Sequence, residues 1–470
     1  MTFHRLFYPA LLLKALLMIF IILFAGIGLG PDEAQYWTWS RKLDVGYYSK
    51  PPGIAWQIFL STGLFGATEL GVRFSAVVMG TLLSIAVYHL AEKAGCPKNV
   101  SALAGLVMAA SPVGIFSTYL AITDGGLLLF WTLGLSELIG KNSYLRFGFF
   151  IACGALFKWP IYLLWVVALV LWIYKPEIRN KTVILGFLIS LLGLLPTLIW
   201  NINHDFATFR HVINTVQGAQ EGNRGNPLEF IGSQIALSSP VFFALACVAA
   251  FRLRQATPSI AFLGMLSLCI LGIYTGYSIF KKGQGNWCLF VYPSFFVWVT
   301  ACSKEKFILW GIALSLALCI GLFAFQSYLP WKMNPFRPNL GWARLEAALK
   351  SFDPKKEFLL ADKYQITSLL SFYNPYQEQA YFINLFGMRK NQFSYWPRPE
   401  KGKNALFVAV EANFNEDVEE YSSLLSPYFE KIHPFKVISL VESEGKSVKK
   451  ALIIPCESYN GRLPEDPEKY

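Results

Sequence analysis

The segment Pro31–Trp56 combines carboxylates, aromatic rings and a lysine in a pattern suited to chemistry on an anionic substrate. It opens with the adjacent carboxylates Asp32 and Glu33, and Lys50 stands directly before two prolines near its end. Its aromatic residues are Tyr36, Trp37, Trp39, Tyr47, Tyr48 and Trp56. A carboxylate can act as a general base, and a fixed cation can bind a phosphate. The alternative is an interfacial loop whose Trp and Tyr rings only anchor neighbouring helices at a membrane surface.

The composition predicts a membrane protein with many spans. Of the 470 residues, 54% are hydrophobic and only 15% are charged, and the apolar residues come in long runs. Runs of about 18 or more apolar residues are typical of transmembrane helices. The net charge of +11 does not favour a nucleic-acid partner, because Lys and Arg are expected in short cytoplasmic loops between spans. The cysteines mostly lie in or beside apolar runs without C-x-x-C spacing, so we predict buried thiols rather than disulfides or metal ligands.

We expect about eleven spans of roughly 17–25 residues each. They are predicted at 6–29, 72–91, 100–119, 124–140, 144–158, 159–174, 182–201, 229–251, 257–280, 287–302 and 307–329. The first is predicted to be an uncleaved span, because no small-residue cleavage site is evident before Asp32. The apolar segment Gly53–Phe65 is shorter than a span and is predicted to be a re-entrant or interfacial helix.

The basic residues predict the orientation of these spans, since Lys and Arg favour the cytoplasmic side. A cytoplasmic N-terminus places the following basic residues on that side: Lys93, Lys98, Lys141, Arg146, Lys175, Arg179, Lys181, Arg252, Arg254, Lys304 and Lys306. The loops 30–71, 120–123, 201–228 and 281–286 then face outward, together with everything after Tyr328.

From residue 330 onward the sequence has the pattern of a soluble α/β domain. Pro330, Pro335 and Pro338 are typical of a linker. Strands are predicted at 358–361, 380–384, 405–410, 437–441 and 451–455, and helices at 365–372 and 417–431. The predicted division is therefore a polytopic α-helical membrane domain, 1–329, followed by an outward-facing soluble α/β domain, 330–470.

Further residues of the outer loops could carry chemistry. Asp124 lies at the mouth of a span, where a carboxylate is costly unless it meets water, a cation or the protein interior, and helix N-capping is the alternative. Lys158 could contact a phosphate or simply extend to the interface. The segment Lys281–Trp287 places cations and exposed backbone N–H groups on the outer side, which suits a phosphate, although a solvated loop is equally consistent. Its candidate binding residues are Lys281, Lys282, Gln284, Asn286 and Trp287.

Two histidines raise the question of a metal. His204 and His211 share an outer loop with Asp205, Arg210 and Arg224. Further ligands at metal-binding spacing are not evident there, so we predict no metal site. A divalent cation held with the help of Glu33 stays open as an alternative.

Three motifs resemble those of the GT-C membrane glycosyltransferases. They are D-E-A-x-Y-W (Asp32–Trp37), Y-x-K-P-P (Tyr48–Pro52) and T-D-G-G-L-L-L-F-W (Thr123–Trp131). The most similar branch contains protein O-mannosyltransferase-like enzymes, lipid A aminoarabinose transferases and Rgt-type galacturonosyltransferases. The segment K-G-Q-G-N-W (Lys282–Trp287) is similar to a segment of that branch ending in N-W-P. The tail segments 341–345, 361–366 and 389–396 resemble bacterial members with a periplasmic C-terminal domain, where they have no assigned role.

The resemblance implies an enzyme of the bacterial inner membrane with its active site on the periplasmic side. Such an enzyme takes a sugar from a polyprenyl-phosphate donor and places it, with inversion, on a lipid A, glycan or protein acceptor. Asp32 matches a catalytic base or acceptor-orienting position, with Glu33 beside it, and Asp124 matches a second acidic position. Lys50 matches the position that binds the donor phosphate, and Lys281 and Lys282 are further cation candidates. The remaining substrate-binding candidates are Tyr36, Tyr48 and Lys158.

This sequence departs from the resembling families in two places. Many Rgt-type members have His where this chain has Lys50, and many have Pro where it has Gly126. Two other classes of function remain open from the sequence. The first is a transporter or flippase of a lipid-linked substrate, and the second is a non-catalytic envelope-assembly subunit.

Overall fold

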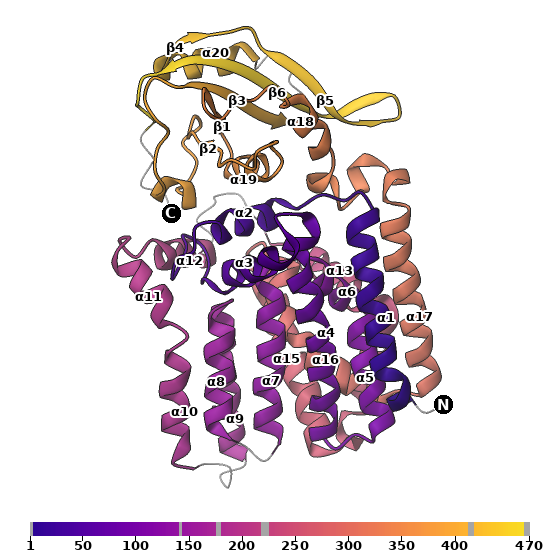
Figure 1. Cartoon of the computed structure of the whole chain (residues 1–470). Coiled ribbons are helices and arrows are strands. Elements are labelled where there is room, and N and C mark those ends of the chain that lie inside the picture. The colour runs from indigo at the N-terminus through magenta and orange to yellow at the C-terminus, as the bar shows by residue number, and fades with distance from the viewer. Residues whose placement is uncertain (1–2, 141–142, 175–179, 218–224, 412–417, 465–470) are drawn as a thin grey trace. The chain divides into compact units, whose positions relative to one another are not determined.

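The structure is a computed structural model that describes residues 3–140, 143–174, 180–217, 225–411 and 418–464 (Figure 1). Among the residues discussed above, Lys141, Lys175, Arg179 and Arg224 lie outside these described ranges, as does the first residue of the predicted helix 417–431. The chain forms two compact units. The helical unit comprises Met1–Phe24, Lys50–Phe206 and Ile213–Ala324, and the sheet unit comprises Ala25–Ser49, Ala207–Val212 and Phe325–Tyr470. The sheet unit therefore combines the tail with pieces of two predicted outer loops.

The helical unit consists of helices and short 3-10 turns. Its helices are α1 (Phe3–Phe24), α3 (Gly53–Phe65), α4 (Glu69–Lys93), α5 (Lys98–Ala110), α6 (Pro112–Tyr119), α7 (Thr123–Ile139), α8 (Tyr144–Ala155), α9 (Leu163–Tyr174), α10 (Thr182–Leu191), α11 (Leu195–Ile202), α13 (Pro227–Ser238), α14 (Pro240–Phe251), α15 (Pro258–Phe280), α16 (Tyr292–Cys302) and α17 (Glu305–Ala324). Helix α12 (Ala207–Gln217) begins in the sheet unit and ends in the helical unit. The segment Gly53–Phe65 is a helix, as predicted.

The number of helices that are long and apolar enough to cross a membrane is smaller than the number of spans predicted from the sequence. Among the described residues, α1, α4, α15 and α17 are each long and apolar enough to cross a membrane, and three bent helix pairs raise the number to seven. The predicted number of about eleven is therefore not confirmed. Each predicted range nevertheless overlaps a helix or a pair of consecutive helical segments.

Proline explains why three predicted spans are bent. The predicted spans 100–119, 182–201 and 229–251 are the pairs α5 and α6, α10 and α11, and α13 and α14, which bend by 62°, 43° and 105°. Pro112, Pro196 and Pro240 stand in the first turn of the second helix of each pair. A proline lacks the backbone N–H and its ring clashes with the preceding turn, so the helix breaks there. At the sharpest bend Ser239 adopts a φ of 81°, which reverses the chain direction further.

Polar contacts show which helix ends meet at each end of the helical unit. Glu137, near the end of α7, pairs with Lys93 at the end of α4 and with Arg146 at the start of α8, each at 3.1 Å. The opposite ends meet where the backbone N–H of Gly53 donates to the carbonyl of Leu156 at 2.7 Å. The end of α7 therefore lies beside the end of α4 and the start of α8, whereas the end of α8 lies beside the start of α3.

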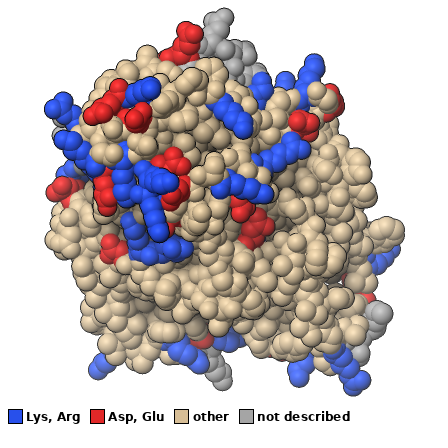
Figure 2. Space-filling view, turned by 45° about the horizontal axis from the view of Figure 1, so that its top comes forward, with Lys and Arg blue, Asp and Glu red and all other residues tan. Residues whose placement is uncertain are grey.

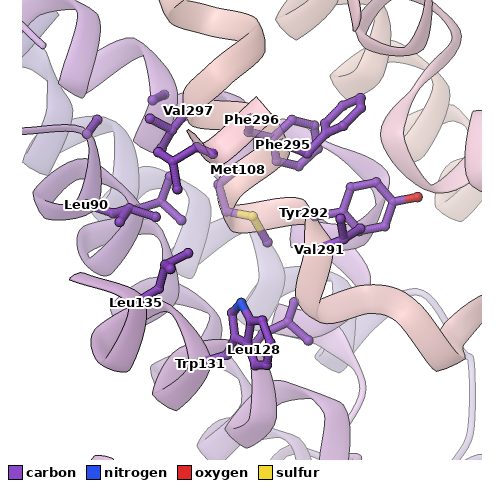
Figure 3. Close-up of a cluster of buried hydrophobic side chains, with 14 of the residues drawn as sticks. Leu90, Met108, Leu128, Trp131, Leu135, Val291, Tyr292, Phe295, Phe296 and Val297 are labelled. Carbon is purple, nitrogen blue, oxygen red and sulfur yellow. The ribbon is translucent and has the colours of Figure 1, made fainter. Parts of the chain in front are cut away.

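The core of the helical unit lies between α4, α5, α7 and α16 (Figure 3). Leu90 of α4, Met108 of α5 and Trp131 of α7 point toward one another and toward the aromatic rings of α16. The Trp131 ring lies 4.5 Å, between centroids, from the ring of Phe290. This packing fixes α7, whose first turn carries Asp124.

The outer surface of the helices is apolar. Lys, Arg, Asp and Glu gather in parts of the molecular surface, and broad areas between them carry no charge (Figure 2). Large apolar side chains such as Leu13 of α1, Ile184 of α10 and Phe280 of α15 are 69%, 70% and 79% exposed. An aqueous surface rarely presents so many large apolar groups, so these helices suit a lipid environment.

The sheet unit contains a mixed six-stranded sheet with helices α2 (Pro31–Ser40), α18 (Trp342–Ala348), α19 (Tyr364–Phe372) and α20 (Val418–Leu425). The strands are β1 (Glu357–Ala361), β2 (Tyr381–Phe382), β3 (Asn404–Glu411), β4 (Phe429–Ile432), β5 (Lys436–Ser443) and β6 (Lys446–Tyr459). Their order is β2-β1-β3-β6-β4, and β5 also pairs with β6. Strand β1 is parallel to β2 and β3, whereas β6 is antiparallel to its neighbours.

Every predicted tail strand overlaps an observed strand, and the predicted helix 365–372 is α19. The prediction of one helix over 417–431 is wrong in its second half. Helix α20 ends at Leu425, Pro427 follows in a 3-10 turn, and Phe429 begins β4 by pairing with Tyr459 of β6. Edge pairing with β6 therefore overrides the helical pattern of this stretch.

Candidate functional site

In the helical unit, two candidate residues form an ion pair. The Lys158 Nζ donates to Asp124 Oδ1 at 2.8 Å, and the two side chains are only 17% and 5% exposed. Asp124 lies in the first turn of α7, where the N-cap residue is Ile122 and makes no side-chain cap bond. Asp124 is thus not the N-cap residue of α7, so the alternative that it only caps this helix is wrong. A buried carboxylate needs a cation, and Lys158 supplies it.

Lys50 belongs to a segment that is hydrogen-bonded to the residues just before Lys158. Three residues after Lys50, Gly53 donates its N–H to the carbonyl of Leu156, which stands two residues before Lys158. A side chain on Gly53 would lie 2.6 Å from that carbonyl oxygen, so only glycine fits this approach. Gly126 is needed for a similar reason, because a Cβ there would collide with the Phe157 ring.

The segment Lys281–Trp287 packs mainly against α13 and α15. The carbonyl of Gly285 accepts from Gln234 Nε2 at 3.0 Å, and the Trp287 ring faces Tyr277 at 5.7 Å. Lys282 lies 3.9 Å from Glu229, with both side chains more than half exposed, so the pair contributes little. Lys281 is partly buried, and Gln284 and Asn286 are exposed. Within the described residues, Asp124 and Lys158 bond to each other and to none of the side chains of this segment.

In the sheet unit, Asp32 and Glu33 occupy the first turn of α2. Glu33 is buried, and its Oε2 accepts from the backbone N–H of Gly30 at 2.9 Å, which caps the helix. Asp32 is exposed, and its carboxylate benefits from the positive end of the helix dipole. The rest of α2 is buried, with Trp37 edge-on to Phe372 of α19 at 4.9 Å and Tyr36 against Trp39 at 5.1 Å.

The tail segment 389–396, to which the sequence gives no role, contacts the first predicted outer loop. Gln392 Oε1 accepts from the backbone N–H of Tyr48 at 2.7 Å, and the Tyr395 ring lies 6.0 Å from the Tyr48 ring. The Lys42 ammonium lies 4.8 Å from the Trp396 ring. The segment therefore holds the stretch that contains Tyr48.

Arg389 is a candidate that the sequence did not reveal. Its guanidinium donates to His211 Nδ1 and to the Tyr364 hydroxyl, each at 3.4 Å, and lies 5.8 Å from the Tyr48 ring centroid. Burial raises the pKa of Tyr364, the Asp32 carboxylate raises it further, and Arg389 opposes the shift. Tyr364 therefore lies within electrostatic range of both the Asp32 carboxylate and the Arg389 guanidinium. The only sequence signal was the unexplained motif that begins with Arg389.

Arg389 and two carboxylates follow or end the parallel strands β1, β2 and β3, at the carboxyl edge of these strands. Asp362 directly follows β1, the loop that carries Arg389 follows β2, and Glu411 ends β3. Asp362 is buried, accepts from the Tyr421 hydroxyl at 3.0 Å, and has a pKa raised by burial. Ligands commonly bind beyond the carboxyl ends of parallel strands in α/β sheets. In the described part of the chain, no three side chains among His, Cys, Asp and Glu are arranged to hold a metal ion.

Comparisons of the sequence with known proteins find a family and a relative that are similar to part of the chain. The sequence pattern of the dolichyl-phosphate-mannose-protein mannosyltransferase family matches residues 49–200. A lipid A galacturonosyltransferase, RgtD of Rhizobium johnstonii, is 27% identical over 303 residues, which cover 61% of this chain and 63% of the relative. The chain thus spans somewhat less than two thirds of that relative's length.

The fold is similar to that of ArnT from Cupriavidus metallidurans. In the apo state that structure superposes with a TM-score of 0.67 at 15% sequence identity, covering 95% of this chain and 97% of ArnT. The structure of ArnT bound to undecaprenyl phosphate gives the same TM-score and coverage at 14% identity. At this level of identity the likeness shows the fold, and it extends over both the helices and the tail.

Proposed function

We propose that the chain is a membrane glycosyltransferase of the GT-C class, and that it transfers a sugar from a polyprenyl-phosphate donor to lipid A or another envelope acceptor. The similarity to a lipid A galacturonosyltransferase supports a lipid A acceptor, and the fold shared with a protein that binds undecaprenyl phosphate supports the lipid carrier. We place the reaction at the periplasmic face of the bacterial inner membrane. We also propose that all of the spans predicted from the sequence cross this membrane, including those whose length does not by itself identify them as spans.

The observation that carries the proposal is the setting of Asp32. Its exposed carboxylate stands in the first turn of a helix whose other side chains are almost all buried, so the carboxylate is held in place yet accessible. A general base needs this combination. We assign Glu33 a positioning role, because its buried carboxylate caps the same helix.

The proposed reaction is a single displacement with inversion. The acceptor hydroxyl attacks the anomeric carbon while the bond from that carbon to the phosphate oxygen breaks. Asp32 takes the hydroxyl proton, and the polyprenyl phosphate leaves with the bonding electrons. Lys50 is the proposed phosphate ligand, since a cation stabilises the charge that develops on the leaving group. Asp124 holds Lys158, which we propose as a second phosphate contact.

The remaining candidates receive weaker roles in this proposal. Tyr36 is buried in α2, and we propose that it shapes the region behind Asp32 rather than binding substrate directly. Tyr48 stands beside Arg389 and can line the substrate's path. We retain Lys281, Lys282, Gln284, Asn286 and Trp287 as proposed contacts of the lipid phosphate from a separate segment.

Sugar transfer from radiolabelled polyprenyl-phosphate sugars to lipid A, in membranes that contain the protein, tests the proposal. Asp32→Asn removes the base and keeps the shape, so we expect transfer to fall by about 100-fold or more. Asp44→Asn is the matched control, because Asp44 lies in the same loop and uses Oδ1 to accept from Val45, which asparagine also provides. Undiminished transfer by Asp32→Asn would contradict the role of Asp32 and direct the search to Asp124. No transfer by the wild type from any donor would contradict the function itself.

A further inference from the structure

Arg389 has donors that its surroundings do not use. A guanidinium carries five N–H donors. In the described part of the chain two of them are engaged, with His211 Nδ1 and the Tyr364 hydroxyl, both at the long distance of 3.4 Å. No carboxylate of the described residues lies within ion-pair distance of Arg389. Among the described residues, the Arg389 guanidinium thus forms no ion pair with a carboxylate.

The neighbours of Arg389 orient it without neutralising it. The guanidinium can only donate, so His211 Nδ1 serves as the acceptor of this contact. The ring centroids of Tyr48 and Tyr364 lie 5.8 Å and 5.5 Å from the guanidinium carbon, within the range of cation–π attraction. A planar fork held this way is pre-organised for two parallel hydrogen bonds to an oxyanion.

The position of Arg389 connects it with the proposed chemistry. It follows β2 at the carboxyl edge of the parallel strands, where ligands commonly bind. Tyr364 accepts from Arg389; burial raises the pKa of Tyr364, and the Asp32 carboxylate raises this pKa further. The tail therefore brings a cation to the surroundings of the proposed base, within one compact unit.

We propose that Arg389 is a substrate-binding residue that the C-terminal tail contributes, and that it binds an oxyanion of the glycosyl donor. This proposal rests on the proposed function and extends it to the specificity of the donor. Two sources supply the same chemistry: the carboxylate of a uronic acid sugar and the phosphate of the lipid carrier. His211 and Tyr364 are positioning residues that act through Arg389.

Binding measurements on the purified full-length protein in lipid nanodiscs test the proposal without requiring turnover. Three probes are compared: undecaprenyl phosphate, undecaprenyl-phosphate galacturonic acid and undecaprenyl-phosphate galactose. Arg389→Gln removes the charge and the fork, whereas Arg389→Lys keeps the charge only. Arg344→Gln is the matched control, because Arg344 lies in the same unit in an exposed pair with Glu442 at 3.6 Å. Melting curves verify that each variant is folded.

Hydrogen bonds to a charged group are worth about 1.5–3 kcal/mol, so we expect Arg389→Gln to weaken binding by roughly 10–150-fold. If the phosphate is the ligand, all three probes lose affinity. If the uronic carboxylate is the ligand, only the galacturonic acid probe loses affinity. In either case Arg389→Lys should recover part of the loss, and Arg344→Gln should bind as the wild type does.

The proposal is overturned if folded Arg389→Gln binds every probe as tightly as Arg344→Gln, or if the wild type binds none of them. A role confined to packing would lower the melting temperature of Arg389→Gln and leave these affinities unchanged. Failure of the proposed function looks different, since the wild type would then bind a probe through Arg389 and still transfer no sugar.

Discussion

At the residue scale, the attraction between Asp124 and Lys158 offsets the free-energy cost of removing each of the two charges from water. Each charge is largely removed from water, with the carboxylate 5% and the ammonium 17% exposed, and each therefore depends on the other. Removing one partner of such a pair leaves an uncompensated charge, which costs more than the intact pair contributes. The pair is thus better understood as a local constraint between the start of α7 and the end of α8 than as a source of stability.

A double-mutant cycle measures that dependence. We expect Lys158→Met to destabilise the protein by about 3–5 kcal/mol, because Asp124 is left buried without a cation. The double variant Asp124→Asn with Lys158→Met should be more stable than Lys158→Met alone. Tryptophan fluorescence during unfolding of the detergent-solubilised protein gives the stabilities. Strictly additive effects of the two substitutions would show that the charges do not interact.

At the element scale, Lys449 ties strand β6 to the chain before α18. Its Nζ donates to the carbonyls of Arg337, Pro338 and Leu340 at 3.4, 3.2 and 2.8 Å, and lies 4.3 Å from the Trp342 ring. The carbonyls and the indole favour the ammonium, but burial dominates and lowers the pKa of Lys449 to about 7. Lysine in an unfolded chain has a pKa of about 10.4, so the two states bind different numbers of protons.

This difference predicts how the stability of the sheet unit depends on pH. Between about pH 7 and pH 10 the unfolded chain binds the additional proton, so the free energy of unfolding should rise with pH across this window. Lys449→Met removes the titrating group, and we expect a flatter pH dependence over the same range. Denaturant unfolding at several pH values measures it, with Lys446→Met as the control because Lys446 is exposed on the same strand. A slope that Lys449→Met leaves intact would assign the effect to another group.

The elements that periodicity and hydrophobic runs determine could be predicted from the sequence. The helix Gly53–Phe65 and the strands at Phe358 and Ala405 are local patterns, and they appear where expected. The break at Ser239 and the strand at Phe429 depend on backbone geometry and on pairing with β6, neither of which a local pattern records. The number of membrane spans remains a prediction, because apolar length alone does not show whether a bent helix pair crosses the membrane.

At the scale of the whole chain, the sheet unit is discontinuous, and this could not be predicted from the sequence. The predicted division at residue 329 follows the change in composition and remains a prediction about domains. Packing groups the tail with Ala25–Ser49 and Ala207–Val212 instead. Single side chains make these long-range contacts, as Tyr373 does with Leu29 and Arg389 with His211. The candidates Asp32 and Asp124 were visible as motifs, whereas Arg389 becomes meaningful only when its distant neighbours are known.

The hydrogen bond between Tyr373 and Leu29 links residues 344 positions apart in the sequence. It allows the dependence of residues 25–49 on the tail to be tested. The buried backbone N–H of Leu29 donates to the Tyr373 hydroxyl at 2.7 Å, just before the helix that carries Asp32. Tyr373→Phe leaves this N–H without its acceptor, at a cost of about 1–3 kcal/mol. We expect amide hydrogen exchange in residues 25–49 to accelerate by roughly 5–150-fold as this stretch opens more easily.

Tyr376→Phe is the matched control for this experiment, because Tyr376 is 58% exposed on the same segment of the tail. If the sheet unit opens cooperatively, exchange should also accelerate in α19, which packs against α2 through Phe372 and Trp37. Acceleration confined to the amide of Leu29 would instead indicate a purely local bond. Unchanged exchange throughout residues 25–49 would mean that the first loop keeps its structure without the tail, and that the position of Asp32 does not depend on it.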